Sequence, residues 1–350
     1  MLQKRKKLIL SVLLLLCACA LLFFSDTVRA SSVQAMTTAV GTVIPGLFPF
    51  MILTEIACQC GLLQSGGKLR NRFLQKTFGF SQNVFPCILF GLTGGYPTGI
   101  KTARTLYESG RITQKEAADV CKFCFSPGPA FCIAAVGSGL FASRKTGIFL
   151  FAVNTLASLL TGILFSDRSK TINHPAPTLP SVSPALALPV AVRKSADTMF
   201  SLCAWITAFA AFLSVATQLL PPRPGNLLSL FAEITAACTR AAEVKSIPLC
   251  AAVLQFGGLC ITCQLLPDLQ QIGVPCRYFV LYRCVGAVFA GLLSKGLLYF
   301  FPLNDVQAAA VMFRAYSKNC ISSFFLLLAC FIFILDLAPA KKTCYTVCGR

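Results

Sequence analysis

Leu92-Thr93-Gly94-Gly95-Tyr96-Pro97-Thr98-Gly99 interrupts a long apolar stretch of the chain. Glycine adopts backbone conformations that other residues avoid, and proline lacks a backbone N–H, so both residues break helices. Hydrocarbon offers no partner for the N–H and C=O groups that a break releases, so a lipid-facing helix does not tolerate one. The stretch therefore predicts backbone that lines a cavity or packs inside protein. In transporters, such breaks mark the substrate site.

Two more apolar stretches are broken in the same way. Ser126-Pro127-Gly128-Pro129 interrupts the next stretch, and Phe256-Gly257-Gly258 interrupts one in the second half. Glu233-Ile234-Thr235 lies in the apolar segment before that last break, so each half holds a pair of interruptions. This weak internal repeat predicts two structural repeats around a central site. Whether the repeats are inverted is open at this stage.

The composition is that of an integral membrane protein. Of 350 residues, 56% are hydrophobic and 12% charged, whereas soluble domains carry about 25% charged residues. We expect an all-α polytopic membrane protein with about 8–10 hydrophobic segments and broken or re-entrant helices. The apolar segments are 8–24, 33–63, 84–106, 117–141, 147–166, 196–220, 227–241, 247–266, 275–301 and 319–338. Segment 84–141 is interpreted as a re-entrant hairpin, because both of its arms carry breaks.

Five parts follow along the chain. They are an N-terminal membrane helix at 1–30, a first gate-like repeat at 31–166, a polar linker at 167–194, a second gate-like repeat at 195–301, and a C-terminal membrane helix and tail at 302–350. The N-terminal segment also resembles a signal peptide with a small-residue cleavage site at Val28-Arg29-Ala30. We expect an uncleaved first helix, and cleavage remains the alternative.

The net charge of +19 does not indicate a nucleic-acid partner. The cations gather at segment ends, as in Lys4-Arg5-Lys6-Lys7 and the later cluster of Lys68, Arg70, Arg72 and Lys76. This is the positive-inside pattern, and both clusters face the cytoplasm if two helices lie between them. A positive surplus also suits an anionic solute or anionic lipid head groups.

Metal and redox chemistry are not expected. Most of the 19 cysteines lie inside apolar segments, where they resemble small buried hydrophobes. Two pairs have metal-like spacing, Cys121-x-x-Cys124 and Cys260-x-x-Cys263, but the single histidine, His174, lies in the linker. Zinc sites need clustered ligands, and no nucleophile has a matched base. The sequence therefore predicts no cofactor, no metal and no enzymatic activity.

Several motifs resemble one family in the right order. Gly95-Tyr96-Pro97-Thr98-Gly99-Ile100-Lys101 resembles the S-G-Y-P-x-G-A-K stretch of the sporulation integral membrane protein YlbJ family. Further stretches that continue the resemblance are Ile44–Phe50, Ile112–Ala117, Ser126–Phe131, Glu233–Thr235 and Phe256–Leu259, with Gln264 and Arg283. The chain departs from the family pattern at Phe125, where the family has Asn, and at Ala236, where it has Gly after Glu-Ile-Thr.

The resemblance implies membership of the wider group of membrane proteins with nucleoside-recognition gate domains. It also implies a role in endospore formation, and transport of dipicolinate from the mother cell across the outer forespore membrane. Dipicolinate is a planar pyridine dianion, so its site needs cations or oriented N–H groups and a slot for a ring. Helix N-termini at the breaks would supply the N–H groups.

The candidate site combines these breaks with buried ionisable residues. Lys101 and Arg283 are the first choices for carboxylate contact. Glu233 is expected to pair with one of them or to carry a coupling proton. The alternatives are that Lys101 and Arg104 reach the membrane surface, that Glu233 forms a structural ion pair or stands at a helix end, and that the glycines serve helix packing. The candidate substrate-binding residues are Thr93, Gly94, Gly95, Tyr96, Gly99, Lys101, Ser126, Gly128, Glu233, Thr235, Gly257, Gly258, Gln264 and Arg283.

The function expected from these features is transport of a small organic anion, by resemblance dipicolinate, in a multi-pass protein of the mother-cell or outer forespore membrane. Its partners would be that anionic solute and the lipid bilayer. The alternatives are a nucleoside or metabolite transporter of the same architecture and a non-transporting sporulation scaffold. The oligomeric state does not follow from the sequence.

Overall fold

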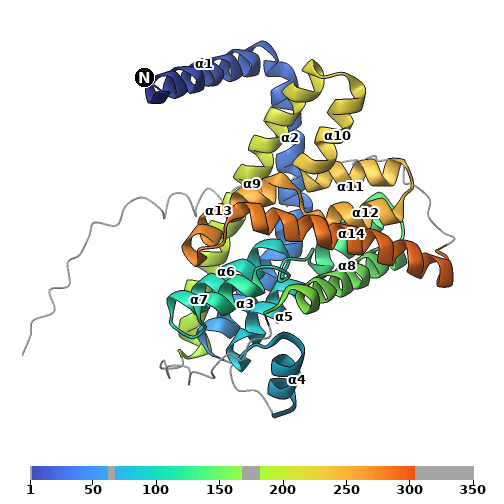
Figure 1. The fold of residues 1–350 in the computed structure, drawn as a ribbon. Coiled ribbons are helices and arrows are strands. Elements are labelled where there is room, and N and C mark those ends of the chain that lie inside the picture. Colours follow the sequence, from blue (N-terminus) through green and yellow to red (C-terminus); the bar gives the residue numbers. More distant parts are fainter. Residues whose placement is uncertain (1, 62–67, 168–181, 304–350) are drawn as a thin grey trace, which may run out of the picture. The chain divides into compact units, whose positions relative to one another are not determined.

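The computed structural model describes residues 2–61, 68–167 and 182–303 (Figure 1). Over these ranges the chain forms helices and no strand, which confirms the predicted all-α class. They belong to one compact unit, Met1–Ala309. His174 and nearly all of the predicted C-terminal part, 302–350, lie outside the described residues.

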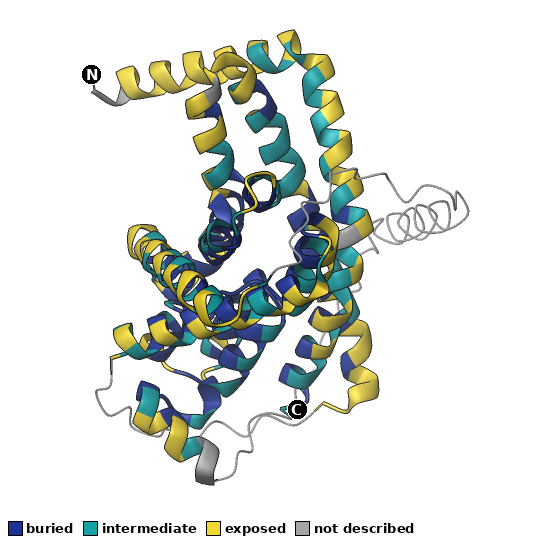
Figure 2. Ribbon diagram, turned by 90° about the vertical axis from the view of Figure 1, so that its right-hand side faces the viewer, coloured by how far each residue is buried: buried dark blue, intermediate teal, exposed yellow. Residues whose placement is uncertain are grey.

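Among the described residues, five helical stretches are long and apolar enough to cross a membrane. They are Lys4–Phe23 in α1 (Leu2–Phe23), α8 (Arg144–Phe165), α9 (Pro184–Leu219), Ile247–Ile272 formed by α12 (Ile247–Phe256) and α13 (Gly258–Ile272), and α14 (Cys276–Phe300). A sixth candidate is a pair bent by 49°. It joins α2 (Ser25–Thr38) through the π-helical η1 (Ala39–Val43) to α3 (Ile44–Gln59). Figure 2 shows exposed residues along nearly all of α1, as expected for a lipid-facing helix. The chain is a multi-pass membrane protein.

The first break is the tip of a helical hairpin. α5 (Phe85–Thr93) and α6 (Tyr96–Glu108) fold back on each other at Gly94 and Gly95. Thr98 Oγ1 donates to the carbonyl of Phe90 at 2.8 Å, whereas residues eight apart in one continuous helix lie about 12 Å apart. Gly95 has a φ of +89°, which L side chains rarely adopt. Helices of nine and thirteen residues are about 14 and 20 Å long, too short to cross a bilayer core.

The two ends of this hairpin lie together. Asn83, in the short η2 (Gln82–Val84), donates from its amide to the carbonyl of Arg111, at 3.0 Å. The backbone N–H of Ser81 donates to Glu116, in α7 (Gln114–Val120), at 3.1 Å. The chain therefore leaves the hairpin at the end where it entered, as a re-entrant hairpin does.

The next segment crosses the protein beside the hairpin tip. It turns at 121–123, has no regular secondary structure at 124–128, and continues as the π-helical η3 (Phe131–Leu140), antiparallel to α8. Lys122 donates to the carbonyl of Phe165 at the end of α8, at 3.0 Å. Further along the chain, η3 packs against Gly147, near the start of α8. Between these contacts, Gly128 packs against Gly95. The predicted hairpin at 84–141 is thus a hairpin, 85–108, followed by a broken crossing, 121–140.

The second half repeats this arrangement. α10 (Pro222–Ala232) and α11 (Ile234–Glu243) meet at Glu233, and the side chain of Arg240 donates to Asn226 although the two residues are fourteen apart. They therefore form a second hairpin with Glu233 at its tip. The broken crossing beside it is α12–α13, in which Gly257 and Gly258 both have a φ of +80°. A Cβ on Gly258 would lie 3.3 Å from the carbonyl of Ala232, so this break contacts the second tip.

The two repeats run in opposite directions. The rings of Phe165 and Tyr282 are 5.1 Å apart, and Thr161, one turn earlier in α8, contacts Gly286, one turn later in α14. The helices that precede the hairpins are antiparallel too, because Lys194 near the start of α9 pairs with Glu55 near the end of α3 at 2.7 Å. Inverted repeats of this kind are common in transporters.

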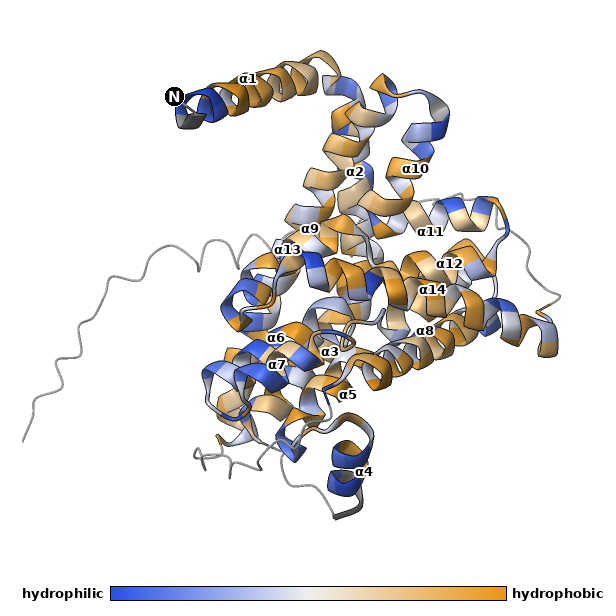
Figure 3. Cartoon of the chain, in the orientation of Figure 1, coloured by the Kyte–Doolittle hydropathy of each residue, from blue (hydrophilic) through white to orange (hydrophobic). Residues whose placement is uncertain are grey.

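Two differences from the expected boundaries have local causes. α9 begins at Pro184, inside the range predicted as linker, because proline is favoured in the first turn and apolar residues follow it. The basic helix α4 (Lys68–Phe78) packs at the end of α8, where Phe78 stacks on Phe123 at 5.2 Å. Figure 3 shows hydrophilic residues on α4 and at the start of α1. Two candidate crossings lie between these basic clusters, as the expected orientation requires.

The inverted arrangement predicts where the hairpin ends face. An epitope tag inserted at 109–113, after the first hairpin, should lie on the opposite side of the membrane from one at 244–246, after the second. A tag at 273–275 should share the side of the first, because Gln114 donates to the carbonyl of Ile272 at 3.0 Å. The side on which each tag lies is measured by antibody binding to the tag in sealed vesicles of either orientation. Equal access to 109–113 and 244–246 would contradict inversion.

Candidate functional site

The backbone breaks of both halves meet. Gly95 at the first tip contacts Gly128, and Gly258 contacts Ala232 and Glu233 at the second tip. Gly257 joins the two groups, since a Cβ there would lie 2.6 Å from the ring of Phe125 and 3.3 Å from the ring of Tyr96. The backbone breaks, which are far apart in the sequence, therefore lie together in one continuous region of the fold.

Arg283 is the charged residue of this region. Its side chain, on α14, is fully buried at 0% exposure. Nη1 donates to the carbonyl of Phe125 at 2.7 Å, and the guanidinium lies 3.9 Å from the centre of the Phe125 ring. Nε and Nη2 are buried and have no hydrogen-bond partner among the described residues. A buried, half-satisfied cation without an acidic partner is costly, so its free donors suit an anionic ligand.

Aromatic rings hold the Arg283 side chain in place. The Phe125 ring lies 4.9 Å from the ring of Tyr96 and 5.4 Å from that of Phe279. Tyr96 donates its hydroxyl to the carbonyl of Leu254 at 2.6 Å, which ties the first tip to α12. Because rings contact the guanidinium over its face, the N–H groups at its edge are left to a ligand.

Other buried polar atoms near the breaks also lack partners. Ser126 follows Phe125 directly, and its hydroxyl is buried and unpaired among the described residues. Gln255 donates to Ser158 at 2.8 Å, yet its side-chain carbonyl oxygen has no partner in the described ranges. Gln255 also contacts Gly286, which lies one turn after Arg283. Unpaired buried donors and acceptors are rare in proteins, so this group is consistent with a site that receives a polar ligand.

The structure brings most of the candidate residues into this region but not all. Those at the meeting of the breaks are Thr93, Gly94, Gly95, Tyr96, Ser126, Gly128, Glu233, Gly257, Gly258 and Arg283. Thr93 contributes its carbonyl near Gly128, while its hydroxyl bonds within α5 to Leu89. Thr235 is half-buried in the first turn of α11. Gln264 lies two turns along α13, with both amide atoms buried and unpaired among the described residues.

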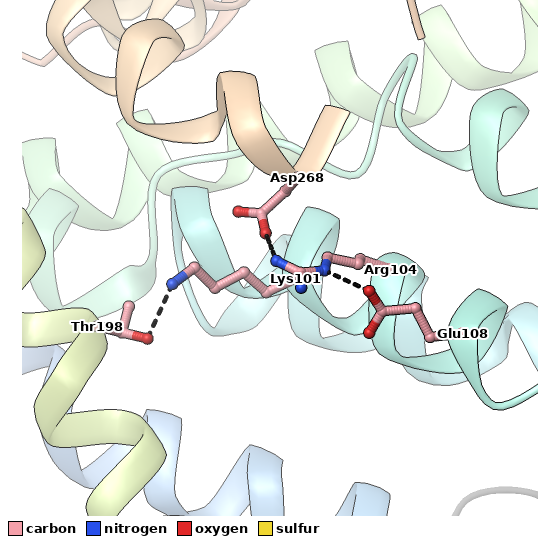
Figure 4. A network of polar contacts seen from close by, with 5 residues as sticks. All are labelled: Lys101, Arg104, Glu108, Thr198 and Asp268. Atoms are coloured by element: carbon pink, nitrogen blue, oxygen red, sulfur yellow. Dashed lines mark hydrogen bonds and ion pairs between the residues drawn. The ribbon is translucent and has the colours of Figure 1, made fainter. Parts of the chain in front are cut away.

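Lys101 faces a different set of residues. Its ammonium donates to Thr198 on α9 at 2.9 Å (Figure 4). Arg104, one turn on, pairs with Asp268 of α13 at 2.7 Å and with Glu108 at 2.8 Å. These contacts fasten α6 to α9 and α13, so Lys101 and Arg283 do not converge in this state. Neither basic residue of α6 pairs with Glu233.

Phe125 stands out in the sequence only as a departure from the family pattern, whereas in the structure it supplies both a carbonyl and a ring to Arg283. Its place directly before Ser126-Pro127 is the one available signal, since an extended break exposes the carbonyl before it. The Asp268 pairing gives no such signal. The pairing depends on how α6 packs against α13, and no local sequence pattern predicts that packing.

A curated protein similar to this chain is the sporulation integral membrane protein YlbJ of Bacillus subtilis (strain 168). The two are 29% identical over 178 residues, which cover 46% of this chain and 44% of that protein. The match thus spans less than half of the relative's length. It supports the resemblance drawn from the motifs. No family model matches the chain, and no solved structure does.

Gly99 allows close packing of the backbone, so a larger residue at this position should destabilise the fold. A Cβ there would lie 2.3 Å from the carbonyl oxygen of Cys124 and 2.6 Å from the Cα of Gly91, both rigid backbone atoms. We expect Gly99→Ala to lower the free energy of unfolding by roughly 1–3 kcal/mol, measured by denaturant unfolding in detergent micelles. Gly296→Ala is the control, because nothing lies within 4 Å of that Cβ. Equal stability of the two variants would contradict this packing.

Proposed function

We propose that this chain is a membrane carrier for a small organic anion and that it acts in endospore formation. The sporulation role is proposed from the relative's name together with the shared motifs. The anion is proposed from the region where the breaks meet. Inverted repeats with re-entrant hairpins are more typical of carriers than of scaffolds.

The observation that carries the proposal is the state of Arg283. Nε and Nη2 lie at one edge of a guanidinium, and that edge is free among the described residues. Such an edge matches a carboxylate bidentately. The dipoles of the half-helices that begin at Tyr96 and Gly258 place further partial positive charge at the breaks. A neutral nucleoside would leave the cation uncompensated, so the anion is favoured.

Dipicolinate is the specific solute we propose, carried across the outer forespore membrane. It offers two carboxylates to Arg283 and the helix N-termini, and a flat ring for which Phe125 and Tyr96 are the aromatic partners we propose. Aromatic pairing of this kind contributes roughly 0.5–1.5 kcal/mol beyond burial. The flat dianion thus uses both the charge and the rings of the site.

Binding to purified protein tests the site. We expect the wild-type chain to bind dipicolinate and Arg283→Gln to bind it at least about 10-fold more weakly, because charged hydrogen bonds contribute roughly 1.5–3 kcal/mol. Lys101→Gln should bind nearly as well as wild type, since Lys101 is engaged by Thr198. Calorimetric titration measures both. A nucleoside that binds in place of dipicolinate would favour the alternative transporter, and no binding of either would favour a scaffold.

Should Arg283→Gln fail to fold, Phe125→Leu tests the same site and should also weaken binding, because it removes the ring beneath the guanidinium and leaves the carbonyl in place. The role in the cell is tested by deleting the gene in a spore-former and measuring dipicolinate in spores. We expect spores poor in dipicolinate and an excess left in the mother cell or medium. A normal spore content would overturn the proposed solute.

A further inference from the structure

Glu233 lies at the tip of the second hairpin and is 6% exposed. Its Oε2 accepts a hydrogen bond from the backbone N–H of Ala236 at 2.8 Å and so caps α11. Its Oε1 is buried and has no hydrogen-bond partner among the described residues. Gly258, at the break of α12–α13, packs against its backbone.

The Glu233 carboxylate has no basic side chain as a partner within 2–61, 68–167 and 182–303. The titratable groups facing it are the thiols of Cys238 on α11 and Cys260 on α13, and Thr235 adds a hydroxyl and a backbone N–H. Partial positive charge comes from the N-terminus of α11, which Glu233 caps, and from that of α13, which begins at Gly258 beside it.

Capping alone does not require an ionisable residue here. Asn, Ser or Thr would accept the same hydrogen bond from Ala236 without carrying a charge into the interior. An ionised carboxylate without a partner is expensive at such a place, and such groups in membranes commonly bind protons or face ion pathways. The protonated form is neutral and turns one oxygen into a donor.

We propose that Glu233 is a proton-binding site and that its proton is carried together with the anion held at Arg283. The coupling rests on the proposed function, whereas the proton site itself does not. The two hairpin tips occupy equivalent places in the inverted repeats. The first tip lies beside the anion-binding groups and the second carries the acid. A proton bound at the second tip lowers the net negative charge that is carried across the membrane with the anion.

Infrared spectroscopy of the purified full chain tests the proton site without any solute. We expect a carboxylic-acid C=O band at neutral pH that disappears in Glu233→Gln. Gln keeps an oxygen for the N–H of Ala236, so the cap survives the change. Glu243→Gln is the matched control on the same helix and should keep the band, because Glu243 is half-exposed and paired with Arg240 at 2.6 Å. No acid band in wild type, or one that survives Glu233→Gln, would overturn the proton site.

Transport in proteoliposomes tests the coupling, with dipicolinate as the probe. We expect an inward proton gradient to drive accumulation by wild type and by Glu243→Gln. Glu233→Gln should exchange dipicolinate across the membrane yet fail to accumulate it. Equal accumulation by Glu233→Gln would overturn the coupling. If wild type moves no dipicolinate while the acid band behaves as expected, the proposed solute fails and the proton site stands.

Discussion

A backbone group released by a broken helix needs a partner that lipid does not supply, and this constraint organises the described part of the chain. The breaks at Gly94–Gly95, Ser126–Pro129 and Gly257–Gly258 are kept from lipid together, because each packs against another break or a hairpin tip. Glycines make the approach possible where backbone meets backbone, as at Gly95 and Gly128. The same requirement that keeps the breaks out of lipid therefore gathers them in one place. Helix N-termini and polar atoms are concentrated there as a consequence.

Arg283 is the charged group at the meeting of the breaks, and its surroundings indicate what the region is suited to bind. Its aromatic neighbours cover the face of the guanidinium, its Nη1 is held by the carbonyl of Phe125, and its remaining donors have no protein acceptor among the described residues. A structural ion pair would have used a carboxylate, as Arg104 does with Asp268. The contrast between these two arginines separates a group that fastens helices from one whose donors are left without an acceptor among the described residues. The first joins α6 to α13, and the second faces the junction of both repeats.

Much of the fold could be predicted from the sequence, because glycine and proline at 94–99, 126–129 and 256–258 act locally on the backbone. The hairpin at 85–108 follows from the same residues, but its exact extent does not, since the irregular segment at 124–128 is also apolar sequence broken by proline and glycine. The sequence leaves the direction of the second repeat open, because the hydropathy of a segment does not depend on the direction in which it crosses. Lys101 and Arg283 looked equivalent as buried cations, and only the packing of α6 against α9 and α13 distinguishes them. Phe125 carried no chemical signal of its own.

The inversion of the repeats does not make the two hairpin tips alike, and the difference between them has a physical meaning. Gly94 and Gly95 allow the first tip to approach Gly128 closely, so the backbone near Arg283 stays free of side-chain charge. The second tip places Glu233 where the symmetric position has no ionisable group, and its capping bond uses only one of the two oxygens. Opposite charges that remain unpaired within one core are hard to explain as stabilising features, because pairing them would have been cheaper in desolvation energy. Kept apart, Arg283 and Glu233 can each be neutralised by something that arrives from outside, an anion at one and a proton at the other.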